Sequence, residues 1–144
     1  MTFEWSPQLA VGIEVIDAQH RELFRRVDRF VNALAEQASA AETMHLLGFL
    51  GEYVVTHFAD EEGLMAEHAY PGTGAHAAEH ARFTATFEEL RNEFARLGTT
   101  PKLAEAVERE VCRWLFAHVG GTDRALADFV RGSAPAGLEA VNSI

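Results

Sequence analysis

Apolar residues recur at intervals of three and four positions along most of the chain, which is the spacing of one face of an α-helix. Four stripes of this kind lie within residues 20–34, 46–65, 76–97 and 103–118. Ala, Leu, Glu and Arg are abundant in these segments, and all four residue types favour helix. The pattern therefore predicts four amphipathic helices.

The connections between the stripes are short and lie near residues 38–41, 68–74 and 98–101. Short connections make consecutive helices antiparallel neighbours. The predicted fold is therefore all-α, an antiparallel up-down-up-down four-helix bundle. Residues 1–17 precede the first stripe and are expected to form an N-terminal arm that packs against the bundle. We take residues 1–131 as one four-helix domain and expect residues 132–144 to form a loose C-terminal tail.

Three glycines, Gly48, Gly51 and Gly63, lie inside the second predicted helix. Each costs about 1 kcal/mol relative to Ala in a helix interior. Either a neighbouring segment approaches closely at these positions, or the helix is locally irregular there.

Composition narrows the class of protein. The 144 residues are 48% hydrophobic, enough for one domain with a core. Twelve Lys and Arg against 22 Asp and Glu give a net charge of −10, so phosphate backbones and anionic membranes repel the chain. There is no leader-like start and no apolar run of about 18 residues, and the single cysteine, Cys112, excludes an internal disulfide. We expect a cytoplasmic monomer that neither binds nucleic acid nor inserts into a membrane.

The seven histidines point to a metal, because His is the commonest metal ligand and an acidic chain has no solubility need for them. Five fall on the apolar stripes together with Glu61, a carboxylate that is costly to bury without a partner. In an up-down-up-down bundle, the starts of the first and third helices meet the ends of the second and fourth. The topology therefore gathers one cluster at that end: His20, His57, Glu61, His76, His80 and His118.

Local spacing favours metal ligation. Glu61 follows His57 by four residues, and His80 follows His76 by four, so each pair projects from one face of its helix. Each pair can therefore hold one ion. Zinc prefers four ligands, whereas a cluster this rich in donors suits six- and five-coordinate iron or manganese.

A further carboxylate, Asp123, follows His118 by five residues. In a regular helix it would point about 140° away, so we expect Gly120 and Gly121 to end the helix and allow a turn. Five imidazoles, two bridging carboxylates and a shared oxide or hydroxide would fill six positions at one ion and five at another. The donor set thus predicts a two-metal centre with one open coordination position.

These residues resemble the hemerythrin family, and within it the single-domain bacterial members. The resemblance runs from about residue 5 to residue 123. It rests on Trp5, Gly12-Ile13, Ile16-Asp17-Ala18-Gln19-His20, the run from His57 to Glu62, Met65, Tyr70-Pro71, His76-x3-His80-x2-Phe83 and Trp114-Leu115-x2-His118-Val119-x3-Asp123.

The resemblance implies two non-haem iron ions per chain, bridged by oxide or hydroxide. It assigns His76, His80 and His118 to one iron and His20 and His57 to the other. Glu61 and Asp123 would bridge them. It further implies reversible binding of dioxygen at the five-coordinate iron, for storage, transport or delivery of O₂ to a protein recipient, without catalysis.

Two other functions stay open: sensing of O₂ or redox state through a separate partner, and a di-iron enzyme that acts on peroxide or nitric oxide or stores iron. An oxidase of the ferritin type is disfavoured, because such enzymes use two Glu-x-x-His motifs. Here only Glu42-x-x-His45 fits, and it lies at the wrong end of the bundle.

The surroundings of the cluster carry further expectations. Asp17 is expected to be a helix N-cap or an imidazole partner, and Asp60 and Glu62 to be solvated or to face an imidazole. His45 and His68 should lie at the surface or in a loop. A dry apolar layer would favour reversible binding over turnover. We expect that layer to consist of Leu23, Phe24, Val54, Phe58, Phe83, Trp114 and Leu115.

Overall fold

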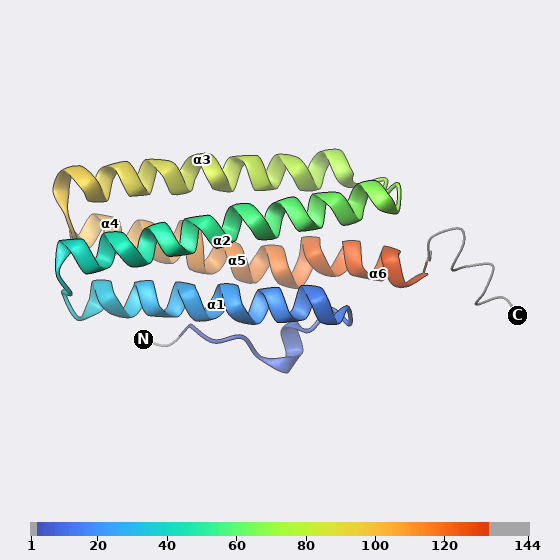
Figure 1. The fold of residues 1–144 in the computed structure, drawn as a ribbon, viewed down its shortest axis with the longest axis horizontal. Coiled ribbons are helices and arrows are strands. Elements are labelled where there is room, and N and C mark those ends of the chain that lie inside the picture. Colours follow the sequence, from blue (N-terminus) through green and yellow to red (C-terminus); the bar gives the residue numbers. More distant parts are fainter. Residues whose placement is uncertain (1–2, 133–144) are drawn as a thin grey trace, which may run out of the picture.

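Four long helical columns lie side by side in the computed structural model, which describes residues 3–132 (Figure 1). The first three columns are single helices: α1 (Glu14–Ala35), α2 (Ala40–Glu67) and α3 (Thr73–Leu97). The fourth column returns along the bundle from Pro101 to Gly132. The predicted all-α bundle is confirmed. The tail expected from residue 132 onward lies, apart from Gly132, outside the described residues.

The fourth column is one uninterrupted helix that contains two π-helical turns. It consists of α4 (Pro101–Val107), a π-helical turn η2 (Glu108–Arg113), α5 (Trp114–Ala117), a second π-helical turn η3 (His118–Asp123) and α6 (Arg124–Gly132). Gly120 and Gly121 lie inside η3, and the next residue after the turn, Arg124, keeps helical dihedral angles of −63° and −41°. The expectation that these glycines end the helix is therefore wrong.

Local sequence explains the ends of the other helices. The Ser39 side chain accepts a hydrogen bond from the Glu42 amide at 3.1 Å and caps the start of α2. Thr100 caps the fourth column in the same way, with Pro101 at its first position. Gly98 ends α3 with a φ of 69°, a conformation that glycine adopts without strain.

The N-terminal arm packs against the bundle and carries one short 3₁₀ helix, η1 (Pro7–Leu9). Phe3 is buried and stacks on Phe24 of α1 with ring centroids 4.5 Å apart. Helix α1 begins at Glu14, so the last four residues of the predicted arm 1–17 belong to the helix. The carboxylate of Asp17 explains the early start. It accepts hydrogen bonds from the backbone amides of Val11 and Gly12 and so holds the arm against the first turn of the helix.

Of the three glycines in α2, Gly51 shows the expected close approach. A Cβ atom there would lie 2.9 Å from a ring carbon of Phe87 on α3. The space beside Gly48 and Gly63 is open to at least 4 Å. The helix is nevertheless a regular α-helix throughout, so the alternative of a local irregularity is wrong.

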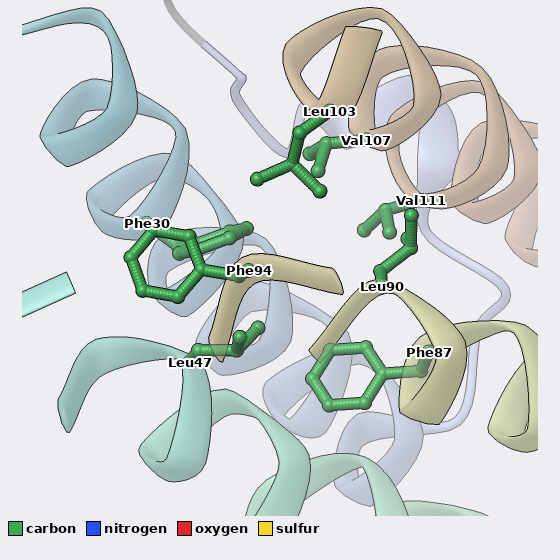
Figure 2. A pocket seen from close by; sticks show the side chains of 8 residues that line it. All are labelled: Phe30, Leu47, Phe87, Leu90, Phe94, Leu103, Val107 and Val111. Atoms are coloured by element: carbon green, nitrogen blue, oxygen red, sulfur yellow. The ribbon is translucent and has the colours of Figure 1, made fainter. Parts of the chain in front are cut away.

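The end of the core away from the predicted histidine cluster is mainly apolar, and Thr43 is a fully buried polar residue near the start of α2. Figure 2 shows the apolar side chains that line a cavity at this end. A small cavity of about 10 Å³ lies there, enough for about one water-sized molecule. The side chains that surround it come from all four columns: Phe30, Leu47, Phe87, Leu90, Phe94, Leu103, Val107 and Val111. Within residues 3–132, no helix combines the length and the apolar character that crossing a bilayer requires.

Candidate metal centre

All seven predicted ligands meet at one end of the bundle core. The four columns each contribute, and every one of these side chains belongs to a residue that is at most 2% exposed. Their positions are His20 on α1, His57 and Glu61 on α2, His76 and His80 on α3, and His118 and Asp123 in the π turn η3. They fall into two overlapping groups whose ligand atoms lie within 4.8 Å of one another, and both groups include Glu61 and Asp123.

The two carboxylates lie between the two groups of imidazoles. Glu61 directs Oε1 toward Nε2 of His76 and His80, at 3.2 and 3.1 Å, and Oε2 toward Nε2 of His57 at 3.1 Å. It therefore presents one oxygen to each group. This is the arrangement that a carboxylate bridging two cations requires.

Asp123 repeats this arrangement from the fourth column. Its Oδ1 lies 3.0 Å from Nε2 of His76 and 3.1 Å from Nε2 of His118, whereas Oδ2 lies 2.9 Å from Nε2 of His20. The π turn makes this possible, because its hydrogen bonds span five residues instead of four and bring His118 and Asp123 to the same side of the helix.

Several of these buried atoms face one another without satisfactory hydrogen bonds. His20 Nε2 and Asp123 Oδ2 are close enough to bond but are misaligned, and Glu61 Oε2 also has no aligned donor among the described residues. Buried polar atoms are rarely left in this state in folded proteins. Imidazole nitrogens and carboxylate oxygens that converge in this way fit bound cations.

Outer partners fix the orientation of three imidazoles through their Nδ1 atoms. His57 donates to Gln19 Oε1 at 2.8 Å, and Gln19 in turn donates through Nε2 to Asp60, also at 2.8 Å. The other two imidazoles donate to carboxylates at 2.9 Å, and these pairs are His80 with Glu62 and His118 with Glu79. A proton held on Nδ1 leaves Nε2, which faces the cluster, free to bind a metal.

Sequence reasoning missed Gln19 and Glu79 in this outer role. Each directly precedes a predicted ligand in the sequence but contacts an imidazole on a neighbouring column. The only local signal was a polar residue at the edge of a buried stripe, which any solvated position shares. Asp17, a candidate imidazole partner, instead accepts backbone amides of the arm.

Burial and mutual charge together shift the pKa values in the cluster. Burial alone would lower the pKa of His20 and of His76, but the adjacent carboxylates of Asp123 and Glu61 outweigh it and raise both pKa values to about 9. Burial would likewise raise the pKa of each carboxylate, yet the imidazoles hold that of Asp123 at about 2 and that of Glu61 well below its usual range. Without a metal, protons on the imidazoles neutralise the carboxylates. A cation would replace those protons.

Aromatic and aliphatic side chains surround the cluster. Phe58 stacks on His80 with ring centroids 3.8 Å apart, and Trp114 stacks on His118 at 4.4 Å. Six of the seven residues expected in the apolar layer are buried, whereas Trp114 is partly exposed. His45 is exposed near the start of α2 and His68 is half-buried at its end, outside the cluster.

Comparison with known proteins gives an independent view. The sequence model of the hemerythrin HHE cation binding domain matches residues 11–130. The chain is 33% identical over 127 residues to a bacteriohemerythrin of Stenotrophomonas maltophilia, which covers 88% of this chain and 80% of that protein. It is 31% identical to a bacteriohemerythrin of Pseudomonas aeruginosa over 90% of this chain and 82% of the relative. It is also 26% identical to a myohemerythrin of Riftia pachyptila, with coverages of 84% and 88%.

Proposed function

This chain belongs to the hemerythrin family, and from that premise we propose that it binds dioxygen reversibly at a di-iron centre. The observation that carries the proposal is the pair of buried carboxylates, Glu61 and Asp123, each with one oxygen toward either group of imidazoles. A site for a single ion would need only one of the two groups. The proposed role is storage, transport or delivery of O₂ in the cytoplasm rather than catalysis.

In the proposed assignment, His76, His80 and His118 hold one iron, and His20 and His57 hold the other. Glu61 and Asp123 would bridge the two ions, together with an oxide or hydroxide. One iron then has one protein ligand fewer, which supplies the open position for a small gas molecule. Five neutral imidazoles and two carboxylates offset much of the charge of two divalent ions in an apolar core.

When bound, the ferrous pair supplies the electrons and the open coordination position that O₂ binding requires. The chain itself supplies a dry enclosure. Leu23, Phe58 and Leu115 are at most 5% exposed, and none of them can donate a proton. Water and protons are thereby kept from the ions, which favours release of intact O₂ over reduction.

Visible spectroscopy tests the reversibility. The ferrous protein should develop a charge-transfer band in air, lose it under argon and regain it over repeated cycles. Prompt conversion to a stable ferric spectrum would overturn the carrier role and favour a redox enzyme at the same site. Spectral cycling that requires a second protein would instead favour sensing through a partner.

Metal analysis tests the site. We expect two iron ions per wild-type chain and a clear loss of iron from His57→Ala. The matched control His45→Ala, on the same helix but outside the cluster, should retain both ions. Circular dichroism confirms that each variant folds. Equal iron content in the two variants would refute the ligand assignment.

A further inference from the structure

We propose that the two metal positions hold their ions with unequal strength, because different groups stand behind their imidazoles. The three-imidazole position (His76, His80 and His118) retains its ion, whereas the two-imidazole position (His20 and His57) exchanges its ion readily. Glu62 and Glu79 stand behind the first position, and the neutral amide of Gln19 stands behind the second. This inference rests on the proposed di-iron function and deepens it. It concerns how firmly each ion is held, which the ligand set alone does not determine.

Glu79 makes the strongest contribution to the three-imidazole position. Its Oε1 accepts a hydrogen bond from His118 Nδ1 at 2.9 Å and another from the Thr122 hydroxyl at 3.0 Å. Both donors lie in the π turn η3, so the same carboxylate orients His118 and fastens the turn that carries Asp123. An anion that accepts from Nδ1 also increases the basicity of Nε2, which strengthens the bond of that nitrogen to a metal.

Glu62 acts in the same way on His80, from the neighbouring helix α2. Its Oε2 lies 2.9 Å from His80 Nδ1. Its side chain is 44% exposed, whereas that of Glu79 is 30% exposed. Because water screens a more exposed charge more strongly, we expect Glu62 to contribute less than Glu79.

The two-imidazole position has no anion directly behind it. Asp60 accepts the hydrogen bond from Gln19 Nε2, and since a carboxylate can only accept, the amide oxygen of Gln19 must face His57. The charge of Asp60 is therefore one amide further away. Nδ1 of His20 has no hydrogen-bond partner within the described residues, and the same is true of Nδ1 of His76 in the three-imidazole position. The two positions therefore differ in the partners of His57, His80 and His118.

Timed release of iron to a chelator tests this inequality. The intact chain is loaded anaerobically with Fe²⁺ and mixed with excess ferrous chelator, and the coloured complex is followed with time. We expect two phases of one iron each. Glu79→Gln should speed the slow phase by roughly 10- to 100-fold, the usual effect of losing an outer partner of a metal ligand. Glu89→Gln, an exposed carboxylate on the same helix α3, serves as the matched control and should change neither phase.

The opposite variant separates charge from structural disruption. Gln19→Glu is combined with Asp60→Asn, because Gln19 Nε2 donates to Asp60 and two carboxylates at that distance would repel each other. The double variant places an anion directly behind His57 and should slow the fast phase, whereas a change that merely disturbs packing would not tighten binding. This variant also keeps the test decisive if Glu79→Gln fails to fold. A single phase for both ions, or an unchanged fast phase in the double variant Gln19→Glu with Asp60→Asn, would overturn the inference and leave the di-iron function intact. Fewer than two ions per wild-type chain would overturn the proposed function itself.

Discussion

At the scale of single residues, Glu61 and Asp123 determine the behaviour of the centre. Both are fully buried, and a buried carboxylate must be paired with a positive charge. Imidazolium groups fill that role when no metal is bound, and cations compete for the same oxygens. The chain therefore exchanges protons for metal, and its folding and its metal binding depend on the same few atoms.

This exchange predicts how the stability of the metal-free chain changes with pH. The pKa values of His20 and His76 are about 9 in the folded chain, against an ordinary value near 6.5 when unfolded. The folded state therefore holds these protons more tightly. The resulting stabilisation is complete below about pH 6.5 and disappears as the pH rises through about 9.

Urea unfolding of the chelator-treated protein measures the effect. The urea concentration at the midpoint of unfolding should decrease as the pH rises from about 6.5 to about 9. The metal-loaded protein serves as the control, because its imidazoles carry no proton on Nε2, and its midpoint should change much less. A metal-free midpoint that is constant or rises across the same range would contradict the prediction.

Six of the seven residues in the cluster, all except Asp123, were predictable from the apolar pattern for a physical reason. A histidine or glutamate on an apolar stripe is costly to bury, so its presence there signals a compensating partner. Gln19 and Glu79 carry no such signal, because a polar side chain at the edge of a helix is favourable in water whether or not it also faces an imidazole. Contacts of this kind depend on how the columns pack, which the pattern of one helix does not encode.

At the scale of helices, the fourth column shows which features the apolar periodicity of a sequence does not predict. Its apolar spacing correctly predicted a helix but not its two π turns or its continuation beyond Gly121. The turn η3 depends on contacts distant in sequence. Arg124 donates to the carbonyl of Gly120 within the turn and to the carbonyls of Gln8 and Ala10 in the arm. The arm and the turn are therefore fastened by one guanidinium.

Removing that guanidinium should weaken both segments. We expect Arg124→Ala to lower the free energy of unfolding by about 1–3 kcal/mol, since it leaves three carbonyls without their charged donor. Arg113→Ala removes an exposed pair with Glu108 on the same column and should cost less than about 1 kcal/mol. Denaturant unfolding of the two variants provides the comparison. Equal losses would show that Arg124 does not fasten the turn.

At the scale of the whole molecule, the two ends of the bundle have different roles. One end concentrates every buried histidine of the described chain, and the other contains a small cavity lined only by apolar side chains (Figure 2). A change at the apolar end should therefore alter stability without altering the metal centre.

Filling the cavity tests this separation. Val111→Ile adds one methylene beside the empty space and should raise the free energy of unfolding by about 0.5–1 kcal/mol. Val27→Ile makes the same change at a fully buried position that does not line the cavity, and overpacking there should lower stability by about 1 kcal/mol or more. Thermal unfolding distinguishes the two. Both variants should keep the wild-type iron content, and loss of iron from Val111→Ile would show that the two ends are coupled.

The π turn at His118–Asp123 can also be understood as a place where the length of the chain is free to vary. A π turn is an α-helical segment with one residue added, and the helix after it keeps its direction. Deleting Gly121, beside which the space is open, would leave the imidazole and the carboxylate four residues apart, the spacing at which an ordinary α-helix aligns two side chains. A hemerythrin whose turn is one residue shorter would therefore present the same imidazole and carboxylate to the cluster. A sequence motif that requires an interval of five residues from the histidine to the aspartate would not recognise it.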